Sequence, residues 1–253
     1  MGPTLGRGRR GSQRLNPLVR LRLEKGAADC GFEMTPLERD GGLELRSARF
    51  PETVVVRTDD GAEFSLSASN PMLLDVPGVS PMGALQDYEA LYDCLRQIAA
   101  RARTLPDRVA EKFALATSGM PQTTEAERLV VERVGQNIFR AALLDYWQVR
   151  CCVTGLAVPE LLRASHIKPW ARCATDQERL DAFNGLLLAP HLDALFDAGL
   201  MTVDDDGSVR LARRLRFEDR VRLGVSTELR VSGLRNWHCQ YLAFHREAVW
   251  RDA

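Results

Sequence analysis

The sequence has little that would suit a membrane, a secreted protein or a structural zinc site. None of its apolar runs approaches the roughly 18 residues needed to cross a bilayer, and its N-terminus lacks the apolar core of a signal peptide. Its six cysteines are scattered and form no C-x-x-C pair, the spacing typical of zinc ribbons and redox sites. We therefore expect a cytoplasmic protein with reduced thiols and no membrane partner.

An excess of charge of either sign is also missing. The chain has 34 Lys and Arg against 34 Asp and Glu, so a surface for a polyanion must come from local clustering. What is present is an ordinary globular composition, with 45% apolar and 27% charged residues. A length of 253 residues allows one large or two modest domains, and we expect two.

The first part of the chain predicts a flexible arm followed by a small α+β domain. Residues 1–15 are rich in Gly, Arg and Ser and hold too little apolar surface to order themselves. Residues 16–118 contain two helical patterns and three strand-like stretches, which we place at 16–28, 85–98, 43–45, 53–58 and 63–67. This domain is expected to recognise a target or sense a signal, although it contains no recognisable ligand motif.

A linker is expected near residue 120, where small and turn-prone residues cluster over Thr117–Gln122. Thr124 and Glu127 have the spacing of a capping box, which predicts the start of a long helix that reaches Trp147. We assign residues 121–253 to the second domain.

The second domain changes to short elements that place polar residues at strand and helix ends. Short elements are expected at Cys151–Thr154, 162–167 and 185–188, two of them strands, and a helix at Pro190. Pro169 ends a strand just after His166, whereas Pro190 suits the first turn of a helix that carries His191. The overall fold class is α+β, with two strands and a helix in the ββα-metal arrangement.

Three residues in these elements match the needs of phosphodiester hydrolysis, namely a base, a cation ligand and a brace for the loop between them. His166, Asn184 and His191 supply these parts, and the Asn184 amide can both donate and accept hydrogen bonds. Gly185 is expected to permit a tight backbone turn. A packed histidine or an Asn-Gly turn is an equally ordinary interpretation, so the spacing alone does not decide.

The motifs around these residues are more specific. The C-terminal half resembles the HNH endonuclease family, in its bacterial restriction-type branch, through the runs Cys152–Gly155, Leu162–Trp170, Asn184–Leu188 and His191–Leu200. The similarity also includes Gly135–Arg140 upstream and Tyr241–Arg246 downstream. It implies a nuclease with double-stranded DNA as its substrate.

The resemblance implies that His166 is the general base and that Asn184 and His191 complete the catalytic set. His191 would ligate a divalent cation, Mg²⁺ or Mn²⁺, together with residue 165. Many members of the family carry Asp before the base, whereas this chain has Ser165, a weak neutral ligand. Asp193 or Asp197 could replace the missing carboxylate.

The same resemblance guides the remaining expectations. Arg140, Arg163 and Lys168 are expected to contact DNA phosphates, and Cys151 and Cys152 to be core thiols rather than zinc ligands. The leading interpretation is an endonuclease in restriction or phage defence. The alternative is a decayed HNH module that binds DNA or regulates, which the Ser165 substitution favours. A homodimer is left open by the sequence.

Overall fold

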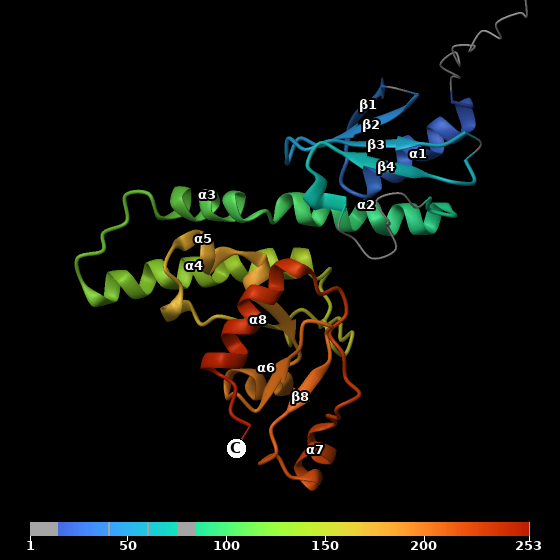
Figure 1. Ribbon diagram of the computed structural model, residues 1–253. Coiled ribbons are helices and arrows are strands. Elements are labelled where there is room, and N and C mark those ends of the chain that lie inside the picture. Colours follow the sequence, from blue (N-terminus) through green and yellow to red (C-terminus); the bar gives the residue numbers. More distant parts are fainter. Residues whose placement is uncertain (1–14, 40, 60, 75–83, 253) are drawn as a thin grey trace, which may run out of the picture. The chain divides into compact units, whose positions relative to one another are not determined.

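The computed structural model describes residues 15–39, 41–59, 61–74 and 84–252 (Figure 1). All but the last residue of the arm expected at 1–15 lies outside the described part of the chain. The chain divides into two compact units, Met1–Ala99 and Ala100–Ala253. Among the described helices, none is long and apolar enough to cross a membrane.

The N-terminal unit is built on an antiparallel sheet of order β1-β2-β3-β4, with strands Met34–Arg39, Gly42–Arg46, Val54–Arg57 and Ser65–Ala68. Helix α1 (Pro17–Asp29) begins after Asn16, whose side chain accepts a hydrogen bond from the Leu18 amide at 2.9 Å. A 3-10 turn, η1, follows β4 at Pro71–Leu74. The three predicted strands are confirmed. Strand β1 was not predicted because it is an edge strand that buries only Pro36.

The division between the units falls inside helix α2 (Tyr88–Arg103) and differs from the boundary near residue 120 that the sequence suggested. Residues 118–124 do form an exposed loop, but it joins two helices of one unit. Helix α3 (Pro106–Thr117) contacts α4 and α5, and its Phe113 belongs to the same core as Val131. Turn-forming residues predict where the chain bends. They do not predict whether the helices on the two sides of the bend pack into one core.

A long helix and a pair of strands carry the first part of the candidate site in the C-terminal unit. Helix α4 (Glu125–Tyr146) starts with the predicted capping box, in which Thr124 accepts from the Glu127 amide and Glu127 accepts from the Thr124 amide. Strands β5 (Arg163–His166) and β6 (Gly185–Leu188) pair antiparallel, with His166 opposite Gly185. Helix α6 (Pro190–Asp197) follows β6 and contacts β5, so the predicted strand, strand, helix order is confirmed here.

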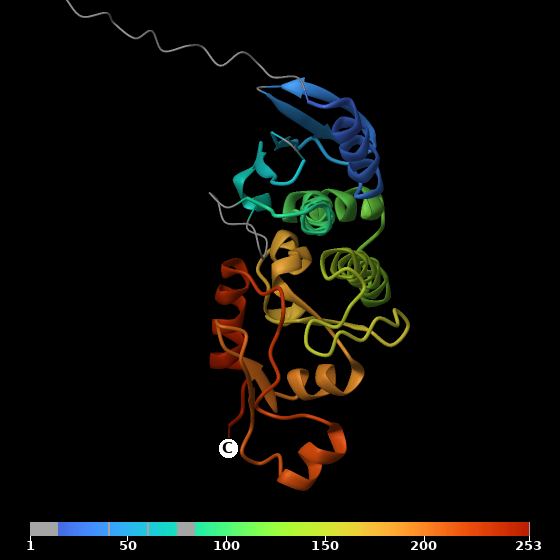
Figure 2. The ribbon, with the colours of Figure 1, turned by 90° about the vertical axis from the view of Figure 1, so that its right-hand side faces the viewer.

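Short elements complete this unit. The connection from β5 to β6 contains η2 (Trp170–Arg172), α5 (Asp176–Leu180) and η3 (Ala182–Asn184). Strands β7 (Met201–Val203) and β8 (Val209–Leu211) form a hairpin, which helix α7 (Phe217–Leu223) follows. The terminal helix α8 (Asn236–Ala248) contacts β7. Figure 2 shows the ribbon from a second side.

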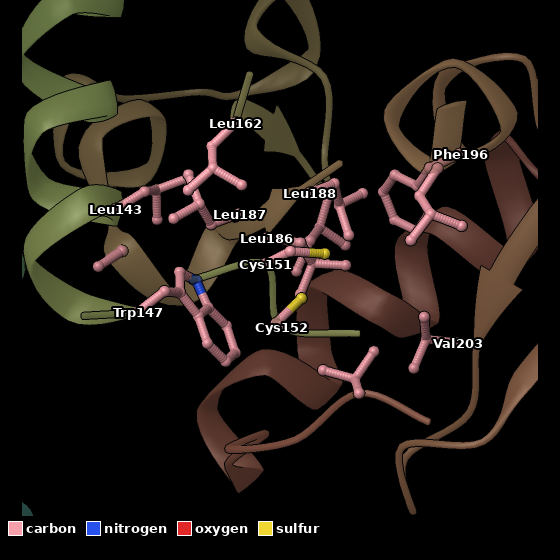
Figure 3. Packing of buried hydrophobic residues seen from close by; sticks show 14 of the residues in the cluster. Leu143, Trp147, Cys151, Cys152, Leu162, Leu186, Leu187, Leu188, Phe196 and Val203 are labelled. Carbon is pink, nitrogen blue, oxygen red and sulfur yellow. The ribbon is translucent and has the colours of Figure 1, made fainter. Parts of the chain in front are cut away.

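The short element expected at Cys151–Thr154 is a turn and not a strand. The Gly155 amide donates to the Cys151 carbonyl and Gly155 has a φ of 73°, which closes a turn. Cys151 and Cys152 are each 2% exposed and lie in the apolar cluster of Leu186, Leu187 and Leu188 (Figure 3). Burial raises the pKa of the Cys152 thiol, which disfavours the thiolate that zinc requires. Both cysteines are therefore core thiols, as predicted.

Candidate functional site

His166 is the last residue of β5, and its imidazole is held on two sides. Its ring stacks on the Phe139 ring of α4, with centroids 3.7 Å apart and planes 15° apart. Its Nε2 lies 2.8 Å from the carbonyl oxygen of Arg179. A carbonyl only accepts a hydrogen bond, so Nε2 must carry the proton and donate it. This tautomer leaves the lone pair on Nδ1, for which no protein partner is present among the described residues.

The surroundings also keep the imidazole of His166 uncharged. Burial lowers its pKa to about 4, and the hydrogen bond to Arg179 opposes this shift only in part. The neutral ring is therefore the main form at pH 7. A neutral imidazole with a free Nδ1 is the form that can accept a proton.

Asn184 connects the segments of the loop that follows His166. Its side chain is fully buried, and its Oδ1 accepts from the Lys168 amide at 2.7 Å. Its Nδ2 donates to the carbonyl of Lys168 at 3.2 Å and to that of Glu178 at 3.1 Å. The Asn184 backbone carbonyl accepts from Ile167 at 3.0 Å. The structure thus shows the loop bracing that the residue type suggested.

A buried carboxylate that the sequence did not single out supports the turn before Asn184. Asp181 accepts from the Phe183 amide at 2.9 Å and from the Tyr241 hydroxyl at 2.8 Å. Burial raises the pKa of Asp181 to about 6. Its only sequence signal is an Asp placed to cap the short turn of η3, a pattern too common to stand out.

Gly185 has another role than the turn that was predicted. Its φ of −147° and ψ of 144° are extended, a conformation open to any residue. A Cβ at this position would lie 2.6 Å from Cζ of Phe139 and 2.6 Å from Cδ1 of Leu143. The glycine is required because α4 approaches the strand closely at this point. A contact between segments so far apart in the chain cannot be predicted from the sequence.

The predicted metal ligands come from β5 and α6. Ser165 is 2% exposed, and its hydroxyl donates to the carboxylate of Asp193. His191 is the second residue of α6 and is partly exposed. Asp197 stands one turn beyond Asp193, and desolvation, then the Asp193 carboxylate, raises its pKa to about 6 although its side chain is exposed. Among the described residues, no group of three or more His, Cys, Asp and Glu is gathered to hold a metal ion.

The three residues expected to contact DNA differ in their surroundings. Arg140 donates to the carbonyls of Leu162 and Pro159, so its guanidinium holds the segment before β5. Lys168 forms an ion pair with Glu178. Arg163 is exposed and has no side-chain partner among the described residues. Of the three, Arg163 has the surroundings that best suit a phosphate contact.

Residues 151–204 match the model of the HNH endonuclease family. The matched segment contains Ser165, His166, Asn184 and His191, and it runs from the turn before β5 to the end of β7. The predicted resemblance in the C-terminal half is therefore confirmed, and the match indicates a nuclease. The flanking runs Gly135–Arg140 and Tyr241–Arg246 lie outside the matched segment. Comparison with curated proteins gave no match.

A further pair of buried histidines predicts how stability depends on pH. Burial lowers the pKa of His238 to about 3 and that of His245 to about 4, so both are neutral in the folded protein at pH 7. The unfolded chain binds their protons first, near pH 6.5. Their contribution to stability is complete above pH 6.5 and decreases as the pH falls towards 4.

We expect His245→Gln to flatten this decline. Between pH 6 and 4.5 the free energy of unfolding of the wild type should fall more steeply, by up to about 1.4 kcal/mol per pH unit for that one proton. Urea titrations followed by circular dichroism measure the slopes. Equal slopes in the two proteins would show that His245 is not held neutral.

Proposed function

We propose that this protein is a metal-dependent endonuclease that hydrolyses phosphodiester bonds in double-stranded DNA. The match to the HNH endonuclease family supports a nuclease. The observation that carries the proposal is the state of His166, a neutral imidazole whose Nε2–H donates to the Arg179 carbonyl and whose Nδ1 has no partner among the described residues. That is the arrangement of a general base for water.

In this mechanism His166 accepts a proton through Nδ1 from the water that attacks the phosphorus atom. Its pKa of about 4 makes it a weaker base than one matched to neutral pH, so its effect depends on accurate placement. The hydrogen bonds of Asn184 to Lys168 and Glu178 hold the loop between these residues in place beside β5. Arg163 contacts the DNA backbone and contributes affinity that depends on salt.

The available donors fit a cation that is held weakly. Asp193 and Ser165 touch across α6 and β5, and His191 lies in the same first turn of α6. Carboxylate, hydroxyl and imidazole suit Mg²⁺ or Mn²⁺, with water and the scissile phosphate as further ligands. A bound cation would polarise the phosphate and stabilise charge on the leaving oxygen. Asp193 would thus be the main ligand from this strand–helix contact, in the role expected of Ser165, and the Ser165 hydroxyl would be at most a weak neutral ligand.

Substitutions at these positions are expected to change the metal requirement in opposite directions. Ser165→Asp places a second carboxylate against Asp193 in a buried position, so the variant should be less stable in EDTA and gain more from Mn²⁺ than the wild type. Its half-maximal Mn²⁺ concentration for cleavage should fall. His191→Ala and Asp193→Asn should raise that concentration at least about tenfold. Cleavage titrations and thermal shifts with Mn²⁺ measure both effects, and no change in any variant would place the cation elsewhere.

We further propose that the N-terminal unit supplies target recognition in a restriction or phage-defence system. This unit has its own sheet and core, in which Phe32, Leu43, Val54 and Phe64 are buried. If the N-terminal unit recognises the target, the cleavage rate should depend on the sequence or the base modification of the duplex. A panel of unmodified and base-modified duplexes tests this, and equal cleavage of every member would remove the recognition role.

The alternative function, a decayed module that binds DNA without cutting it, would follow from the same fold. The replacement of the usual Asp by Ser165 favours it. The contact between Ser165 and Asp193 favours activity instead, because a carboxylate is retained beside that position. Cleavage assays separate the two functions directly.

A further inference from the structure

Two aromatic rings enclose the imidazole of His166, one on its face and one at its edge. Phe139 of α4 is 1% exposed and stacks on the imidazole face. Trp170 of η2 lies edge-on, with centroids 5.6 Å apart and planes 88° apart. The stack fixes the plane of the imidazole, and the hydrogen bond to the Arg179 carbonyl fixes its rotation within that plane.

Each of these rings packs closely against a glycine. A Cβ on Gly135 of α4 would lie 2.5 Å from Cη2 of Trp170, and a Cβ on Gly185 would lie 2.6 Å from Cζ of Phe139. Gly185 stands opposite His166 in the strand pair, so the space beside the imidazole is filled by Phe139 in place of a cross-strand side chain. Gly135 and Phe139 are four residues apart and share one face of α4.

A glycine in the interior of a helix is costly, by roughly 1 kcal/mol relative to alanine, so Gly135 calls for a packing reason. The contact with Trp170 supplies that reason. Arg140, next to Phe139, fixes α4 to the segment before β5 through the carbonyls of Leu162 and Pro159. Gly135, Phe139 and Arg140 thereby lie on the side of α4 that faces His166 or the segments next to it.

We propose that Phe139, Trp170, Gly135 and Gly185 are positioning residues that hold the imidazole of His166 in one orientation for catalysis. The set is called the imidazole clamp below. The proposal rests on the proposed nuclease function for its catalytic purpose and on the described contacts for its geometry. The clamp acts through His166 and makes no contact with substrate, so its loss should lower kcat and leave KM and DNA affinity nearly unchanged.

The chain offers a matched control. Phe196 stacks on His245 with centroids 3.8 Å apart and planes 10° apart, and Phe196 is likewise fully buried. Phe139→Leu and Phe196→Leu therefore remove equivalent stacks, only one of which involves the proposed base. We expect Phe139→Leu to lower kcat about 10- to 100-fold and Phe196→Leu to leave kcat within about twofold of the wild type.

Nuclear magnetic resonance of the full-length protein tests the geometry without any need for activity. The chain has only four histidines, so the His166 ring signals can be assigned by substitution. In the wild type we expect one tautomer, protonated at Nε2, and ring protons shifted upfield by Phe139. Phe139→Leu should remove the upfield shift and mix the tautomers, whereas Phe196→Leu should leave the His166 signals unchanged.

The outcomes separate the two proposals. If Phe139→Leu leaves the His166 signals as they are, or lowers kcat no more than Phe196→Leu does, the imidazole clamp is overturned. If the wild type shows the expected His166 signals but cuts no DNA with Mg²⁺ or Mn²⁺, the proposed nuclease function fails, and with it the catalytic purpose of the clamp. Cleavage by the wild type with loss of both kcat and the upfield shift in Phe139→Leu supports both.

Discussion

His166→Ala should reduce the rate of DNA cleavage by about 100- to 10,000-fold while DNA binding stays nearly intact. The imidazole accepts a proton from water and holds no part of the substrate, so its removal should affect chemistry and spare affinity. Single-turnover cleavage and fluorescence anisotropy with the same duplex measure the two quantities.

The matched control is His245→Gln. His245 is fully buried and stacks on a phenylalanine as His166 does, but it bonds to Thr202 and Phe196 in another part of the unit. Its variant should cleave at a rate close to that of the wild type. Cleavage by His166→Ala at the wild-type rate would remove His166 from the mechanism.

Asn184→Ala should lower both stability and activity. The substitution removes every side-chain hydrogen bond of a fully buried residue and leaves the Lys168 amide without its acceptor. We expect the free energy of unfolding to fall by roughly 2–4 kcal/mol, since a buried donor is left unpaired and a cavity is opened. Cleavage should fall at least about 100-fold at a temperature where the variant is still folded, because the loop beside His166 is no longer held in one conformation.

Asn137→Ala is the comparison for this variant, since Asn137 is exposed on α4 and the substitution should change stability by less than about 0.5 kcal/mol. Urea unfolding followed by circular dichroism gives both values. A variant Asn184→Ala as stable and as active as the wild type would show that the hydrogen bonds of Asn184 do not hold the loop.

Much of the site's local architecture could be predicted from sequence. Pro169 and Pro190 mark the end of β5 and the start of α6, because proline restricts the backbone at both places. Thr124 and Glu127 mark the start of α4 in the same way. These signals are local, so they put His166 at a strand end and His191 in a first helical turn without any knowledge of packing.

Contacts between distant segments could not be predicted. The Arg179 carbonyl that selects the tautomer of His166 has no side-chain signature, and Phe139 has the sequence pattern of any core residue in a helix. The contact of Ser165 with Asp193 depends on how α6 packs on β5. Residues 106–117 were assigned to the N-terminal domain for the same reason, whereas α3 packs into the core of the C-terminal unit.

The most direct test of the central claim is cleavage of plasmid DNA by the purified full-length protein in Mg²⁺, in Mn²⁺ and in EDTA, with His166→Ala in parallel. We predict strand cleavage by the wild type in at least one of the two metals, none in EDTA, and almost none by His166→Ala under any condition. Wild-type protein that binds the DNA but leaves it uncut in both metals would contradict the account and identify the chain as a binding module.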